Sequence, residues 1–95
     1  FWLNIFMIVK HEDDFPRLRR HIRGYRRRYP MFVADIRRIE TNIESCIKIY
    51  SEYMIKYRRS KSETFHQDAL QQLEHINDFI KLIDQIDLVA LLSRR

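Results

Sequence analysis

The residues from 32 to 57 carry the pattern that most restricts how this chain can fold. Their large apolar and aromatic side chains recur in alternating steps of four and three, at Phe32, Ile36, Ile39, Ile43, Cys46, Tyr50, Tyr53 and Tyr57. This spacing places them on one face of an α-helix, and such a face is stable only when another helix covers it. We therefore predict a long helix over residues 31–59 whose apolar face packs against a partner helix.

A partner for this face lies further along the same chain. Apolar residues follow a helical period between residues 64 and 92, at Ala69, Leu73, Ile76, Ile80, Ile83, Ile86, Val89 and Leu92. The two segments are similar in length, and only the short turn SKSE separates them, so they should lie antiparallel with a seam like that of a coiled coil. The 95 residues include one glycine and two prolines. The sequence therefore predicts an all-α protein with a single domain (residues 1–95), built on an antiparallel helical hairpin of residues 31–59 and 64–92.

A strongly basic helix is predicted before the hairpin, over residues 15–28. Its apolar residues again step by three and four, and the positions between them carry Arg17, Arg19, Arg20, Arg23, Arg26, Arg27 and Arg28. Pro30 follows, and a proline inside a helix removes one backbone hydrogen bond and forces a bend or a stop. We expect either a kink at residues 26–31 or two helices joined almost without a loop, the second opened by Pro30.

The charge of the chain is divided unevenly and indicates an acidic partner. Residues 10–59 hold fourteen Lys and Arg against seven Asp and Glu, whereas residues 60–95 hold four against six. We expect a non-enzymatic helical interaction protein, a small subunit or scaffold of a larger assembly, whose seven arginines dock an acidic protein or another copy of the chain. One alternative is binding of RNA or DNA phosphates by residues 17–28, with His21, Tyr25 or Tyr29 stacking on bases.

An apolar arm at the start of the chain suggests further contacts. Residues 1–9 read FWLNIFMIV, which is far shorter than the roughly 20 residues of a membrane-spanning helix. The arm either folds onto the helices, inserts into a neighbour, or attaches the chain to an anionic membrane. The last predicted helix is also apolar nearly all round after Phe79. We therefore predict a hydrophobic interface made by the arm and this helix end, with Trp2, Ile5, Phe6, Phe79, Leu82, Leu88 and Leu91.

No motif in the sequence indicates catalysis, and we expect no enzyme activity, cofactor or small-molecule substrate. Glu63 and His66 have the Glu-x-x-H spacing of helical di-metal sites, but they lie at a predicted helix start, where solvated acids are common, so no metal site is predicted. Asp84 and Asp87 lie in a segment of about a dozen residues that resembles the opening helix of the AroQ-type chorismate mutases. The spacing to the following leucine pair and arginine differs, and we assign no activity from it.

The single cysteine points to a reducing compartment. Cys46 lies on the apolar seam, where a small buried side chain is expected, and it has no second cysteine in the chain for a disulfide. The start of the sequence lacks the basic front and small-residue cleavage site of a secretory signal. These features together predict an intracellular location, in the cytoplasm or an organelle matrix.

Overall fold

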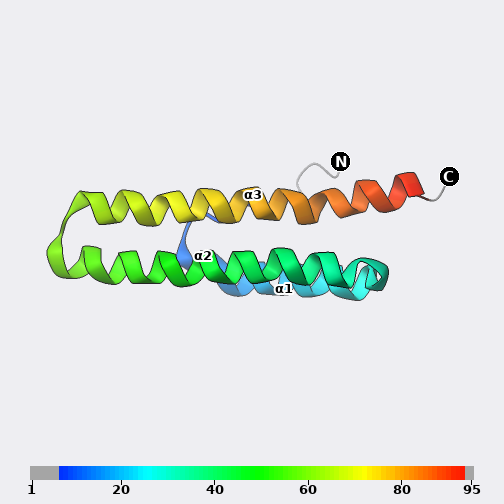
Figure 1. Cartoon of the computed structure of the whole chain (residues 1–95), viewed down its shortest axis with the longest axis horizontal. Coiled ribbons are helices and arrows are strands. Elements are labelled where there is room, and N and C mark those ends of the chain that lie inside the picture. Colours follow the sequence, from blue (N-terminus) through cyan, green and yellow to red (C-terminus); the bar gives the residue numbers. More distant parts are fainter. Residues whose placement is uncertain (1–6, 94–95) are drawn as a thin grey trace.

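The computed structural model describes residues 7–93 and contains three α-helices that pack side by side (Figure 1). In chain order the elements are a 3-10 turn η2 (Glu12–Asp14), α1 (Phe15–Arg28), a 3-10 turn η3 (Pro30–Phe32), α2 (Val33–Ser60) and α3 (Glu63–Ser93). The predicted all-α hairpin is confirmed, with helix ends within two residues or so of the expected ones. No helix within residues 7–93 is both long and apolar enough to cross a membrane.

The hairpin of α2 and α3 is closed by a very short turn. α2 ends at Ser60, and Lys61 adopts the left-handed conformation (φ 58°, ψ 18°) that commonly follows a helix C-terminus. Next to this turn, the rings of Tyr57 and His66 stack with their centroids 4.7 Å apart. The two helices therefore run antiparallel from the turn, as their lengths and short connection predicted.

Between α1 and α2 the chain reverses direction at Pro30. The ring of Phe15, at the start of α1, lies 5.6 Å from that of Tyr50, deep in α2. Near the other end of α1, Arg26 pairs with Glu40, which lies close to the start of α2. The start of α1 is therefore near the later part of α2, and the end of α1 is near the start of α2. The two helices are antiparallel. The expected break is confirmed and the alternative of a kinked continuous helix is wrong, because the 3-10 turn η3 redirects the chain.

The core lies where the three helices meet. Ile43 and Ile80, from the predicted seams of α2 and α3, are 0% and 1% exposed. α1 adds its own apolar face, and the fully buried side chains of all three helices include Leu18, Ile22, Tyr25, Ile36, Ile76 and Ile83. Phe32, Ile39, Tyr53 and Phe79 are partly buried and pack against this core. The basic helix is thus part of the folded unit, because its apolar stripe is covered by both long helices.

The described part of the arm, residues 7–9, lies against α3 (Figure 1). The Asn77 side chain holds Val9 by two backbone hydrogen bonds: its Oδ1 accepts from the Val9 N–H at 2.7 Å, and its Nδ2 donates to the Val9 carbonyl at 2.9 Å. Val9 itself is 1% exposed. A side-chain amide that binds both the backbone N–H and the carbonyl of one buried residue fixes the arm at one position along α3.

Candidate docking surface

The helix α1 has an apolar side, two flanks and an outward side, and its arginines are divided among them. Leu18, Ile22 and Tyr25 are buried in the core. At 100° per residue, Arg20, Arg23 and Arg27 lie on the opposite side of the helix, and all three are exposed. We refer to them as the outward arginines.

The flank of α1 that faces α2 uses arginine for ion pairs within the protein. Arg19 donates from Nε and Nη2 to the two carboxylate oxygens of Glu44, both at 2.9 Å. This two-point hydrogen bonding holds the pKa of the Glu44 carboxyl below its usual value despite partial burial, and raises that of Arg19. Arg26 pairs with Glu40 at 2.5 Å. Two of the seven arginines therefore attach α1 to α2.

The flank of α1 that faces α3 is held by two aspartates of that helix. The side chain of Asp84 is 1% exposed, and its Oδ1 lies 2.7 Å from His21 Nε2, at hydrogen-bond distance. Asp87 accepts hydrogen bonds from the hydroxyls of Tyr25, at 2.7 Å, and Tyr29. We refer to Asp84 and Asp87 as the anchor acids, because they tie the aromatic side chains of the basic segment to α3.

The environment of Asp87 keeps the Tyr25 hydroxyl protonated and Asp87 itself ionised. Burial, together with the hydrogen bond to Asp87, raises the pKa of Tyr25 far above its ordinary value. Burial also acts to raise the pKa of Asp87, but hydrogen bonds from Tyr29 and Tyr25 and the nearby charge of Arg28 outweigh it, and the pKa lies below its ordinary value. The Tyr25 hydroxyl is therefore a fixed donor and the Asp87 carboxylate a fixed acceptor at neutral pH.

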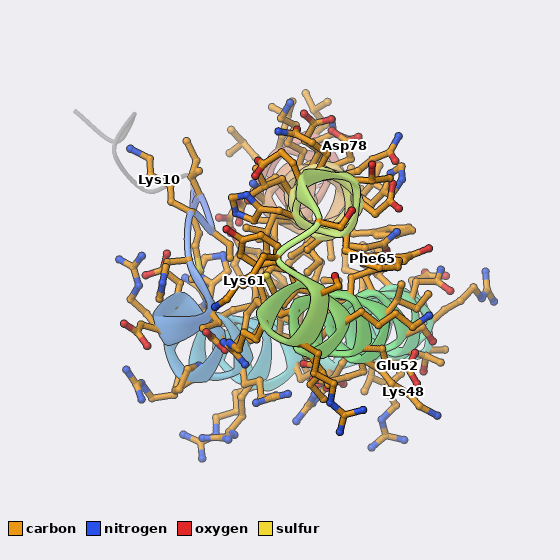
Figure 2. All side chains as sticks on the ribbon, turned by 90° about the vertical axis from the view of Figure 1, so that its left-hand side faces the viewer. Lys10, Lys48, Glu52, Lys61, Phe65 and Asp78 are labelled. Atoms are coloured by element: carbon orange, nitrogen blue, oxygen red, sulfur yellow. The ribbon has the colours of Figure 1, made fainter. Side chains whose placement is uncertain are left out.

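The remaining arginines differ in how much of their charge is available. Arg17 lies 3.3 Å from Asp14 in an exposed pair, and Arg28 lies over the Tyr25 ring, 4.6 Å from its centroid. Within residues 7–93, no acidic side chain lies at ion-pair distance from any of the outward arginines. In a view along the helices, nitrogen-tipped side chains gather below α1 and α2, on the side turned away from α3 (Figure 2). The outward arginines are thus the part of the basic segment that makes no ion pair among the described residues.

The aromatic side chains proposed for base stacking are already engaged in the fold. Tyr25 is 1% exposed, and its ring contacts those of His21 and Tyr29 at centroid distances of 5.1 and 5.9 Å. All three side chains also bind the anchor acids. A flat ring has to be free on one face to stack on a base, so these residues are structural in this conformation.

The residues predicted for a hydrophobic interface separate into three groups. Leu82, Leu88 and Leu91 are 48%, 56% and 59% exposed, and Val89 and Leu92 beside them are also exposed. Phe79 instead packs against the core. Trp2, Ile5 and Phe6 lie outside the described residues. The end of α3 therefore presents apolar side chains that no described residue covers.

The side chains considered in the sequence for a metal site or a nucleophile are Glu63, His66 and Cys46. His66 Nδ1 lies 3.0 Å from Glu63 Oε1 in an exposed pair, and within residues 7–93 no three His, Cys, Asp or Glu side chains come together in a metal-binding group. Cys46 is buried, and burial raises the pKa of its thiol, which disfavours the nucleophilic thiolate. The His66–Glu63 pair links two positions of the first turn of α3, and Cys46 is part of the core.

The anchor acids are residues of this surface whose structural role the sequence analysis missed. Asp84 and Asp87 were noticed only for a short resemblance, although they interrupt an otherwise apolar helix end one turn apart. An acid within an apolar helix face must find a hydrogen-bond donor when it is buried, and the tyrosines and histidine of residues 21–29 are suitable donors. That complementarity is the signal that would have located the contact.

Comparison with protein-family models, with curated proteins and with solved structures gives no match to this chain.

Proposed function

We propose that this protein is a non-enzymatic helical interaction module, a small subunit or scaffold of a larger protein assembly, and that its outward arginines dock an acidic protein surface. One observation carries the proposal. Arg19 and Arg26 pair with α2, whereas Arg20, Arg23 and Arg27 project from the same helix with no acidic partner among residues 7–93.

The fold supports the proposal because it presents these arginines on a fixed scaffold. α1 is held on one flank by ion pairs to α2 and on the other by the anchor acids of α3. The eight residues from Arg20 to Arg27 span about 10 Å of helix axis, and carboxylates three, four or seven residues apart on a partner helix have matching spacing. A guanidinium group binds a carboxylate through two parallel hydrogen bonds, and prior ordering of the helix lowers the entropic cost of binding.

The geometry favours an acidic protein over nucleic acid. Non-specific binding to single strands normally combines a basic groove with aromatic rings on which bases stack. Here the hydroxyls of Tyr25 and Tyr29 are hydrogen-bonded to Asp87, so their rings are not available for stacking. Three outward arginines are also few for binding a phosphate backbone. The following test distinguishes docking to an acidic protein from nucleic-acid binding and from membrane attachment through residues 1–9.

The test compares two variants that lose the same charge. In the first, Arg20, Arg23 and Arg27 are all replaced with Gln. In the control, Lys56, Arg59 and Lys61, at the hairpin turn, are replaced with Gln. The probes are a helical peptide with glutamates at a three- and four-residue spacing, a duplex DNA, a single-stranded RNA, and vesicles with and without anionic lipid, each titrated with salt.

We expect the parent and the control to bind the acidic peptide at low salt. The outward-arginine variant should lose about 1–3 kcal/mol of binding free energy, taking each exposed pair at up to about 1 kcal/mol, which is roughly a 5- to 150-fold rise in Kd. Equal loss in both variants would mean that only net charge matters. Tighter, steeply salt-dependent binding to DNA or RNA would favour the nucleic-acid alternative, and binding only to anionic vesicles would favour the membrane.

A further inference from the structure

The described part of the arm runs along one flank of α3 toward the C-terminal end of that helix. Val9 is bonded to Asn77, while the N–H of Met7, two residues earlier in the chain, lies 3.4 Å from Asp84 Oδ2, seven residues later in α3. Met7 and Ile8 also line a cavity of about 360 Å³ whose other walls come from α3. Going backward along the chain, the arm therefore moves forward along the helix.

The same flank of α3 continues as an uncovered apolar strip. Counting from Asn77, the positions 4, 7, 11, 14 and 15 residues later share one side of a helix. The first of these positions hold Lys81 and Asp84, which contribute to the cavity beside the arm. The next hold Leu88, Leu91 and Leu92, which are 56%, 59% and 56% exposed. This flank of α3 is therefore polar where the arm lies against it, and apolar and exposed beyond that point.

We propose that residues 1–6 dock on this strip of their own chain, over Leu88, Leu91 and Leu92. From the level of Asp84 to the level of Ser93, α3 advances about 13 Å. Six extended residues reach about 20 Å, so the segment is long enough to cover the strip. Its sequence, FWLNIF, contains five apolar residues and one asparagine, which matches an apolar surface.

The connection through Val9 makes the chain's own segment the favoured occupant. A segment held a few residues from its site has an effective concentration in the millimolar range, above that of a second copy in a dilute solution. Docking would bury large aromatic and aliphatic side chains and remove an exposed apolar patch that a monomer in water does not readily tolerate. This inference does not depend on the outward arginines, which lie on the other side of α1.

The chain offers its own reporter for this contact, since Trp2 is its only tryptophan. In the full-length protein at monomer mass, we expect blue-shifted Trp2 emission and several-fold weaker quenching by acrylamide than for free tryptophan. Replacing Leu88 and Leu92 with Gln should shift the emission to longer wavelength and restore quenching. Replacing Leu82 and Val89 with Gln is the matched control, because these residues are similarly exposed, at 48% and 46%, but lie about 110° further round the helix.

Several outcomes would overturn the proposal. One is a Trp2 that is as accessible in the parent as free tryptophan. Another is equal protection of Trp2 in both double variants. Protection that appears only as the protein dimerises with rising concentration would assign the strip to a second copy. Protection that requires lipid vesicles would assign the arm to a membrane.

A disulfide test does not depend on the leucine replacements being tolerated. Leu3→Cys is combined with Leu92→Cys, or with Val89→Cys as the control, and the protein is oxidised when dilute. The native Cys46 is buried and should not compete. We expect the first pair to form a bridge at monomer mass at least ten-fold faster than the control pair, whereas equal rates or bridged dimers would refute docking within the chain.

Discussion

The hold of Asn77 on the arm can be tested by replacing this residue with leucine. Leucine has nearly the shape of asparagine but neither of the two polar atoms that bind the Val9 backbone at 2.7 and 2.9 Å. Each hydrogen bond contributes a net of about 0.5–1.5 kcal/mol, and a buried polar group left without a partner costs about 1–3 kcal/mol. Val9 is 1% exposed, so water cannot replace the lost partner unless the arm moves.

This geometry sets the expected magnitude for Asn77→Leu. The two bonds together predict a loss of about 2–4 kcal/mol in the free energy of unfolding, measured by urea denaturation followed by circular dichroism. The loss is limited by the free energy that holds the arm, because beyond that limit the arm detaches and solvates Val9. Hydrogen exchange at the Val9 amide distinguishes the two cases, since only a detached arm gives fast exchange.

A matched replacement on α2 controls for the change of residue type. Asn42 is exposed, so Asn42→Leu should change stability by no more than about 0.5 kcal/mol. The reasoning is refuted if Asn77→Leu is as stable as this control and the Val9 amide still exchanges slowly. In that case the Asn77 hydrogen bonds would not be what positions the arm.

Three further predictions concern the helices. Gly24 lies inside α1 with open space around the position of a Cβ, so Gly24→Ala should raise the free energy of unfolding by about 0.5–1 kcal/mol, whereas a lower melting temperature would contradict this. Ile43 is 0% exposed, so Ile43→Ala should cost about 2–5 kcal/mol in urea unfolding, and no measurable change would place this side chain outside the core. Ionised Asp87 stabilises the fold above its ordinary pKa of 3.8, and this is lost as the pH falls through the lower folded-state pKa. Tyr29→Phe should therefore cost more stability at pH 7 than at an acid pH below the folded-state pKa of Asp87, and an equal cost at both would show that the hydroxyl does not act through the carboxylate.

The periodicity of the chain was enough to predict the hairpin. Ile36 and Ile43 in α2, and Ile76 and Ile80 in α3, recur at helical spacing and are all buried. Such a repeat predicts the structure well because the packing of two long helices depends mainly on which face each apolar residue occupies. The short turn after Ser60 then fixed the antiparallel direction.

The direction of α1 could not be predicted in the same way. The apolar spacing runs through Pro30 without interruption, so it fits a bent helix and a reversal equally well. The outcome depends on the backbone of Tyr29 (φ −127°, ψ 65°) and the 3-10 turn after it, which are local angles that leave no trace in the hydrophobic pattern. Only the reversal lets Tyr29 reach Asp87 while Arg26 reaches Glu40.

The roles of the arginines were equally hidden. The sequence presents the seven as one basic segment, and their division follows from the placement of α1 between two helices. Arg19 meets Glu44 because that acid lies on the α1 flank of α2, whereas Arg23 lies on the outward side of α1. A position on one helix does not specify which neighbour a long side chain will reach.

The anchor acids determine how late in synthesis the contacts of α1 can be completed. They connect residues about 60 positions apart: His21 with Asp84, and Tyr25 with Asp87. A ribosome releases the arginine-rich helix about 60 residues before the acids that secure it to α3, and α1 and α2 can already pair as a local hairpin. Until then, α1 lacks the contacts that hold its other flank to α3. The arginine-rich helix can therefore contact α2 first, and it gains its contacts to α3 only when synthesis has passed Asp87.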